Sequence, residues 1–354
     1  MNLTIRAPLN TQLGYGHAGW NIVKTLYNLR HGVCLFPLGS SYHLSPEELP
    51  LLEAIHTGSI NYLDHQNPCL LIWHEFALFS QFTCKGKYVA YSFFEVNQLD
   101  PLRQQNMNYC DEILVASNWA KEVVESNGVG TPVSVVPLGV DTEVFKPRQS
   151  VKDGPYKFFT IGKIEQRKCT DILSDIFAAA FDSTDEVEFH IICDSPLPQI
   201  KQQMPAIKEK FRNSKLGDKI FLHNNVPYDQ DLVAFIQQMD CGVFLTRAEG
   251  FGLPILQSMA CGKPVITTDY SAQMEFCTTE NAKLVNITEF EPAIDGVWFH
   301  GLGTWAKIGN KEIGQCIEYM RDCYKNRPAN VAGVETAKKF SWENTCNLCL
   351  KSLQ

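Results

Sequence analysis

Residues 247–269 read RAEGFGLPILQSMACGKPVITTD, and this stretch is the most informative part of the chain. It follows the apolar residues 241–245, which predict a buried strand, and it holds one carboxylate, Glu249, followed by Gly250 and Gly252. A helical pattern comes next, and a β-branched run closes the stretch. This is the pattern of a βαβ unit whose polar groups gather at the carboxyl end of a strand and the amino end of a helix. Backbone N–H groups and the helix dipole favour a phosphate there, so the stretch predicts a nucleotide ligand.

The spacing of two residues in this stretch resembles that of a known family. Retaining glycosyltransferases of the GT-B fold, specifically glycosyltransferase family 4, carry Glu, seven residues and Glu in their donor-sugar loop. Glu249 fills the first position, whereas Gln257 stands at the second. The resemblance implies that Glu249 binds hydroxyls of the donor sugar. It also implies that Gln257 binds the ribose through a neutral amide, which keeps an acceptor and adds donors. The resemblance assigns the intervening backbone to the leaving diphosphate: Gly250, Phe251, Gly252 and Leu253.

Two further segments carry donor contacts in the same family. Residues 162–168 read GKIEQRK, follow a predicted strand over 157–162, and are predicted to open the first helix of a second domain. Their spacing matches the family's Gly-Arg-Leu-x-x-x-Lys, which implies that Lys163 and Lys168 hold the diphosphate, with Lys163 in place of the usual Arg. Two positive charges suit this role because the charge of the leaving group grows as the glycosidic bond breaks. The alternative interpretation is solvated helix charges. The loop around Val226 would lie near the nucleotide base.

The amino-terminal part predicts a strand over residues 2–7, then a loop with Gly14, Gly16 and Gly19, then a helix. The glycine spacing is also that of a dinucleotide fingerprint. A Rossmann dehydrogenase would need an acidic residue at the end of the second strand, however, and residues 36–40 read FPLGS there. The resemblance implies instead that Gly14 and Gly16 face the donor diphosphate across an interdomain cleft. A purely structural tight turn is the alternative.

Residues 70–75 read LLIWHE, which predicts a buried strand ending in two polar residues. A zinc-protease His-Glu-x-x-His motif is excluded because the second His is missing. Members of family 4 often carry a His at a comparable strand end beneath the donor sugar, so the resemblance implies a catalytic role for His74. A satisfied structural His is the alternative. Two other strand ends, residues 92–95 and 116–120, are expected to shape the acceptor cleft, although Ser117 can instead cap a helix.

Two residue pairs raise the question of a metal ion. Asp229 and Asp231 spell the Asp-x-Asp metal motif of the other large glycosyltransferase fold. Asp229 stands just before the apolar positions of a helix, so N-capping and dipole pairing explain it. Cys346 and Cys349 lack a second pair or a nearby His, which favours buried thiols. We therefore expect no metal site and no cofactor beyond the nucleotide sugar itself.

The length of 354 residues predicts two domains, each able to bury its own core. We place an acceptor-side Rossmann-like domain at residues 1–147 and a donor-binding Rossmann-like domain at residues 148–340, with a polar linker at 148–155. Ser341 is expected to be the N-cap of a last helix over residues 341–354, which the resemblance places back on the first domain.

Charge and cysteine usage restrict the partners and the compartment. The net charge is −8, and residues 1–147 hold eight Lys or Arg and thirteen Asp or Glu, so 8 minus 13 gives −5 for this part. An acidic acceptor domain argues against duplex DNA or an anionic membrane as the acceptor surface, because both are bound through clustered Lys and Arg. The thirteen Cys show no pairing pattern, and no signal peptide or transmembrane run is evident. We therefore expect a cytoplasmic protein.

The combined prediction is an α/β protein of the GT-B type, with two doubly wound Rossmann-like domains facing a cleft. The resemblance implies a retaining glycosyltransferase that moves a sugar from a UDP- or GDP-sugar to a hydroxyl of a glycan or another small acceptor. The alternatives are a sugar-nucleotide epimerase or phosphorylase, and a non-catalytic sugar-nucleotide binding protein. The last is suggested by the substitutions at Lys163 and Gln257. Residues 290–310 carry no functional pattern.

Overall fold

A computed structural model describes residues 1–82, 84–148, 154–194, 197–226 and 228–354. The chain forms two compact units, one made of Met1–Asp141 with Phe340–Gln354 and the other of Thr142–Lys339. Of the predicted linker, residues 149–153 lie outside the described residues. Within the described part of the chain, every helix is too short or too polar to span a lipid bilayer.

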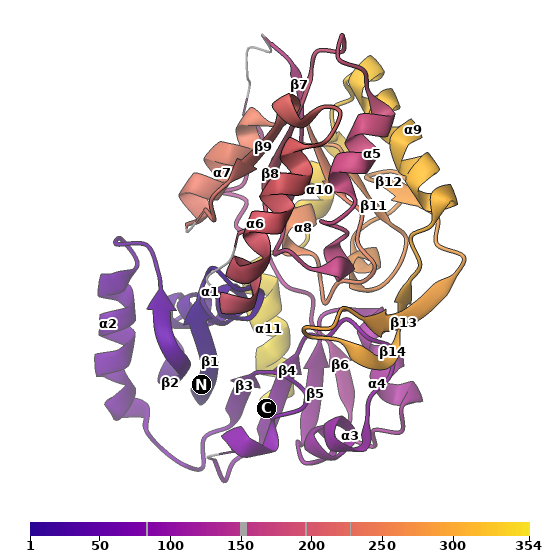
Figure 1. Cartoon of the computed structure of the whole chain (residues 1–354). Coiled ribbons are helices and arrows are strands. Elements are labelled where there is room, and N and C mark those ends of the chain that lie inside the picture. Colours follow the sequence, from indigo (N-terminus) through magenta and orange to yellow (C-terminus); the bar gives the residue numbers. More distant parts are fainter. Residues whose placement is uncertain (83, 149–153, 195–196, 227) are drawn as a thin grey trace. The chain divides into compact units, whose positions relative to one another are not determined.

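The first unit is built on a six-stranded parallel sheet with the order β2-β1-β3-β4-β5-β6 (Figure 1). Its strands are β1 (Asn2–Asn10), β2 (Gly32–His43), β3 (Cys69–Ile72), β4 (Tyr88–Ser92), β5 (Glu112–Val115) and β6 (Val133–Val135). Its helices are α1 (Gly14–Asn28), α2 (Leu49–Gly58), α3 (Pro101–Asn108), α4 (Asn118–Ser126) and the carboxyl-terminal α11 (Trp342–Ser352), drawn in yellow beside the indigo and purple elements.

The second unit contains another six-stranded parallel sheet, with the order β12-β11-β10-β7-β8-β9. Its strands are β7 (Tyr156–Ile161), β8 (Val187–Ile192), β9 (Ile220–His223), β10 (Cys241–Phe244), β11 (Val265–Thr268) and β12 (Lys283–Val285). Its helices are α5 (Leu173–Ala180), α6 (Pro198–Arg212), α7 (Asp229–Gln238), α8 (Leu253–Ala260), α9 (Asn310–Asn326) and α10 (Val331–Ala337). A separate antiparallel pair is formed by β13 (Phe290–Ile294) and β14 (His300–Ala306).

The apolar runs of the sequence account for the central strands. Every residue of β3, β4 and β10 is buried, as expected for parallel strands that are covered on both faces. In the first unit α1 contacts β1 and α11, and in the second α5 packs against α9 and α8 against α10. The prediction of an α/β fold with two doubly wound parallel sheets is confirmed.

The strand order fixes where each sheet can hold a ligand. In a doubly wound sheet, ligands bind outside the carboxyl ends of the strands where the order reverses. That point lies between β1 and β3 in the first unit and between β7 and β10 in the second. The segments that follow these four strands contain most of the residues predicted to be functional.

The start of α1 differs from the prediction. The helix begins at Gly14, so the glycine pattern lies in its first two turns rather than in a loop. A Cβ atom on Gly16 would lie 2.0 Å from the carbonyl oxygen of Asn10, and one on Gly19 would lie 2.3 Å from that of Pro8. These two glycines therefore let the helix pack closely on β1, whereas a Cβ on Gly14 meets nothing within 4 Å.

Two predicted helix caps are confirmed. Ser117 accepts a hydrogen bond from the backbone N–H of Ala120 at 3.1 Å and caps α4. Ser341 accepts one from Asn344 at 3.1 Å and caps α11. The predicted cap at Asp229 is wrong, because Tyr228 occupies the N-cap position of α7. Asp229 and Asp231 lie in the first turn, where the helix dipole favours negative charge.

Candidate functional site

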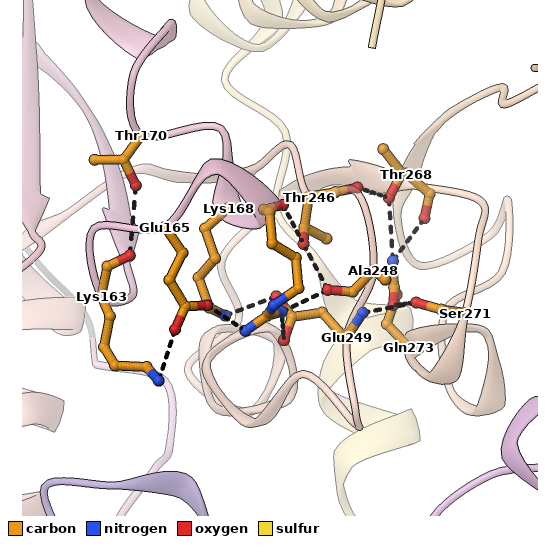
Figure 2. A network of polar contacts seen from close by, with 11 residues as sticks. Lys163, Glu165, Lys168, Thr170, Thr246, Ala248, Glu249, Thr268, Ser271 and Gln273 are labelled. Carbon is orange, nitrogen blue, oxygen red and sulfur yellow. Dashed lines mark hydrogen bonds and ion pairs between the residues drawn. The ribbon is translucent and has the colours of Figure 1, made fainter. Parts of the chain in front are cut away.

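The candidate site of the second unit is formed by the loops after β7 and β10. Lys163 and Lys168 follow β7, and Glu249 follows β10, at the point where the strand order reverses. The structure brings these three predicted residues into one network. Figure 2 shows Lys168 and Glu249 directed toward one another, with Lys163 on the far side of Glu165.

The network alternates cations and carboxylates. Lys168 Nζ lies 2.7 Å from Glu249 Oε1, and Arg167 Nη1 lies 3.3 Å from Glu249 Oε2. Arg167 Nη2 also lies 2.7 Å from Glu165 Oε2, and Lys163 Nζ lies 2.7 Å from the other oxygen of that carboxylate. Three cations therefore hold two carboxylates in a continuous row across both loops.

The cations decide the protonation of both carboxylates. Burial alone would raise the pKa of Glu165, but Arg167, Lys163 and Lys168 together lower it to about 2. Burial would likewise raise the pKa of Glu249, and Lys168 and Arg167 hold it below its usual value. Both groups are therefore ionised at neutral pH, and both are hydrogen-bond acceptors.

Sequence reasoning missed Arg167 and Glu165 as site residues. Arg167 is only 4% exposed, and it also donates to the Ala248 carbonyl at 2.5 Å. It thus ties the loop after β7 to the backbone beside Glu249. The sequence shows a third cation and a carboxylate within residues 162–168, but only the fold shows which partners they contact.

The local structure of residues 162–168 corrects the prediction of a helix. The segment is a loop ending in a single 3-10 turn at Gln166–Lys168, and α5 begins only at Leu173. Cys169 has a left-handed backbone (φ 54°), which stops the turn from continuing as a helix. The loop form lets Lys163 and Lys168 both reach the network, because their side chains need not follow helical spacing.

The backbone of Glu249 is fixed by the segment after β11. Its N–H donates to Ser271 Oγ at 2.8 Å, and that hydroxyl donates to Gln273 Oε1 at 2.9 Å. The amide nitrogen of Gln273 donates to Thr268 Oγ1 at 3.1 Å, which completes the chain drawn in Figure 2. A chain of buried hydrogen bonds therefore holds the backbone that carries this carboxylate.

The glycine loop turns directly into α8. Gly250, Phe251 and Gly252 are buried, and Gly252 adopts φ +94° at the N-cap position, a conformation that favours glycine. Phe251 packs on Phe276 with ring centroids 5.1 Å apart, so its side chain belongs to the core. Leu253 is the first residue of the helix.

Gln257 and Val226 lie apart from the ion-pair network. Gln257 is 4% exposed in α8, and its side-chain amide makes no hydrogen bond to any described residue. Val226 is half-buried in the loop between β9 and α7. The loop that holds Val226 follows β9, which is the edge strand on the β7 side of the sheet. In strand order, Val226 therefore lies on one side of Lys163 and Glu249 lies on the other.

The first unit holds the other predicted residues at its own switch point. His74, after β3, lies with its ring 4.3 Å from that of Tyr15 in α1 and stacks on Phe76 at 5.2 Å. The neighbouring Glu75 is buried and lies 2.9 Å from Arg103 Nε. Burial raises the pKa of Glu75 even though Arg103 opposes the shift. The site role of His74, and that of Gly14 and Gly16, stays a prediction.

All thirteen cysteines are free and buried, including Cys346 and Cys349 in α11. Burial raises the pKa of both of these thiols, that of Cys349 to about 12, so both stay protonated and behave as apolar side chains. Among the residues that the structure describes, no cluster of His, Cys, Asp and Glu is arranged to hold a metal ion.

The second unit matches a known protein family. Residues 155–296 match the family described as glycosyl transferases group 1. An uncharacterized glycosyltransferase of Methanocaldococcus jannaschii is 25% identical over 234 residues, which is 66% of this chain and 56% of that protein. The lipopolysaccharide core biosynthesis mannosyltransferase of Rhizobium meliloti is 28% identical over 159 residues, 42% of this chain and 43% of its own length.

The whole chain resembles solved structures in fold. The Anabaena protein HepE, solved in complex with UDP and glucose, aligns with a TM-score of 0.69 at 14% identity, covering 100% of this chain and 99% of that one. This likeness shows the fold, which is that of GT-B glycosyltransferases. The chain spans about half the length of the curated relatives, so their activities reach it only as a proposal.

Proposed function

We propose that the protein is a retaining glycosyltransferase of glycosyltransferase family 4, which moves a sugar from a UDP- or GDP-sugar to a hydroxyl of a glycan or small acceptor. The observation that carries the proposal is the contact between Lys168 and Glu249 at the switch point of the second sheet. The match of residues 155–296 to group 1 glycosyl transferases covers both loops and supports it.

The ion pairs suggest how a donor is accommodated. A diphosphate carries more negative charge than one carboxylate, so it competes with Glu249 for Lys168 and with Glu165 for Lys163. Once Lys168 turns to the phosphate, an oxygen of Glu249 is free to accept a hydroxyl of the sugar. Arg167 stays between the carboxylates and keeps Glu249 ionised.

The same groups serve the chemical step. The glycosidic bond breaks with its electron pair going to the phosphate oxygen, and Lys163 and Lys168 stabilise that developing charge. The acceptor hydroxyl attacks the anomeric carbon from the same face, and its proton passes to the leaving phosphate oxygen. Gln257 offers its amide to the ribose, and the loop at Val226 borders the base. No metal ion is required, because the two lysines and the start of α8 supply the positive potential.

Donor breakdown in the absence of acceptor tests the proposal. The protein is incubated with UDP-glucose, UDP-N-acetylglucosamine or GDP-mannose in excess chelator, and the released sugar is followed by proton NMR. A transferase releases sugar slowly, and the first anomer to appear has the configuration of the donor. A sugar-nucleotide binding protein releases none. An inverted first product, or a strict need for added Mg²⁺ or Mn²⁺, contradicts the retaining, metal-independent mechanism.

A further inference from the structure

The hairpin of β13 and β14 lies beside the candidate site, although its sequence carries no functional pattern. The backbone N–H of Ala306, the last residue of β14, donates to the carbonyl of Arg247 at 2.9 Å. The backbone N–H of Arg247 in turn donates to the carbonyl of Arg167 at 2.7 Å. The base of the hairpin is therefore joined to both loops of the ion-pair network.

Side chains reinforce this attachment. Arg247 Nε donates to Glu291 Oε1 on β13 at 2.8 Å, and Trp305 Nε1 on β14 donates to the same oxygen at 3.3 Å. Arg247 and Trp305 are both buried. The hairpin is thus held at a fixed position relative to Glu249, two residues beyond Arg247 in the sequence.

The tip of the hairpin is an ordered turn that presents one aromatic ring. Asp295 Oδ1 accepts hydrogen bonds from the backbone N–H groups of Val297, Trp298 and Phe299 at 2.8, 2.7 and 2.9 Å. Phe299 packs its ring on Trp305 at 5.2 Å. Trp298, by contrast, is 40% exposed.

The exposed ring of Trp298 contacts one residue of the candidate site, Lys163. Lys163 Nζ lies 5.8 Å from the centroid of the Trp298 ring, close enough for a cation–π interaction. The same ammonium pairs with Glu165. The ammonium of Lys163 therefore contacts both an indole ring and a carboxylate, and the turn fixes the backbone of Trp298.

We propose that Trp298 is a stacking platform for a sugar ring of the acceptor, an inference that rests on the proposed function. A pyranose has an apolar face of C–H groups and an edge of hydroxyls, which an aromatic ring flanked by charged groups complements. Binding sites of this kind combine aromatic walls with a few polar groups.

The order of the strands favours a sugar over a nucleobase. β9, whose following loop holds Val226, is one edge of the sheet, and β12, which leads into the hairpin, is the other. If the base lies at Val226 and the diphosphate at Lys163, Trp298 is separated from the base by the phosphate site. The ligand group on the Trp298 side of the phosphate site is therefore a sugar.

The indole signals of the protein give a direct test. The chain has six tryptophans, and in a sample labelled with ¹⁵N at the indole nitrogens, Trp298→Phe removes one signal and so identifies it. The wild-type protein is then titrated with methyl α-D-glucopyranoside, methyl α-D-mannopyranoside and N-acetylglucosamine, with and without UDP or GDP, and separately with UDP-glucose and with GDP-mannose. We expect at least one glycoside to shift the Trp298 signal and to leave the signal of buried Trp305 unchanged.

The titrations with nucleotides distinguish failure of this inference from failure of the proposed function. If UDP or GDP binds but no glycoside moves the Trp298 signal, the inference is wrong and the proposed function stands. If only UDP-glucose or GDP-mannose moves it, the ring contacts the donor sugar and the acceptor assignment is wrong. If no nucleotide binds at all, the proposed function itself fails.

Kinetics give a second readout with a matched control. Trp298→Ala should raise the KM for the glycoside acceptor about tenfold, more than it changes the KM for the donor, and Trp298→Phe should restore part of the loss. Phe290→Ala removes another exposed aromatic of the same hairpin, 51% exposed and in contact with Tyr270, and should leave both constants unchanged. Equal effects of Trp298→Ala and Phe290→Ala would show a structural role only.

Discussion

The ammonium of Lys168 lies 2.7 Å from a carboxylate oxygen of Glu249, and this contact joins the loops after β7 and β10. The two residues are 81 positions apart in the sequence. Their pairing brings a cation and a carboxylate together at the switch point of one sheet, where the proposed function needs a partner for a phosphate and an acceptor for a sugar hydroxyl.

Replacing Glu249 by Gln should lower turnover roughly 100-fold or more, because a charged acceptor that strengthens its bond in the transition state is lost. Binding of UDP or GDP should persist. Steady-state kinetics with each donor, together with a thermal unfolding curve, check this. The control is Glu289→Gln, which removes an exposed carboxylate paired with Lys307 outside the site. Near-normal turnover in Glu249→Gln would remove this residue from the mechanism.

Arg167→Met should destabilise the protein strongly, because it leaves the buried carboxylates of Glu165 and Glu249 without their shared partner. Breaking a buried pair costs about 3–5 kcal/mol, and the remaining lysines reduce this toward the lower figure. Lys338→Met, which breaks an exposed pair with Glu335, should change stability little. Urea unfolding of both variants measures the difference. Equal midpoints would mean that Arg167 does not hold the network together.

The depressed pKa of Glu165 predicts acid sensitivity. Its folded-state pKa of about 2 lies below the ordinary value of 4.5, so its stabilising contribution is complete above pH 4.5 and is lost as the pH falls toward 2. Each pKa unit of depression corresponds to about 1.4 kcal/mol. The slope of unfolding free energy against pH between 4.5 and 2 should therefore be smaller in Glu165→Gln than in the wild type. Parallel curves in that range would contradict the assignment.

Gln257→Glu should make the KM for the donor fall or stay level and should change turnover less than about threefold. A charged hydrogen bond to the ribose is worth about 1.5–3 kcal/mol against roughly 1 for a neutral one. Ribose contacts persist through the reaction, so the gain is uniform binding. Repulsion from the diphosphate opposes the gain. If turnover is abolished while the nucleotide still binds, Gln257 takes part in the chemistry.

The sequence was sufficient for the βαβ unit around Glu249 and for both parallel sheets, because buried parallel strands have a distinctive apolar pattern. It was also sufficient for the caps at Ser117 and Ser341, whose hydrogen bonds are local. It did not predict that α1 starts at Gly14. The close approach of Gly16 to β1 is a tertiary contact that a glycine pattern does not reveal.

The same limit applies to the site. Lys163 and Lys168 were chosen by spacing, but Arg167 became important only because the fold brings Ala248 and Glu249 beside it. Residues 290–310 gave no signal because the role proposed for them depends on their contacts with Arg247 at the base of the hairpin and with Lys163 at its tip. Patterns in a single sequence do not reveal contacts between segments that are distant along the chain.

We propose that the Lys168–Glu249 contact marks a nucleotide-sugar site. Isothermal titration of UDP and of GDP, in excess chelator, tests it in the wild type, in Lys168→Met and in the control Lys210→Met, which breaks an exposed pair with Asp175. We predict that at least one nucleotide binds the wild type and the control equally, and that Lys168→Met weakens it about tenfold or more, as expected for a lost charged contact. Failure of both nucleotides to bind the wild type, or equal affinity in Lys168→Met, would contradict the claim.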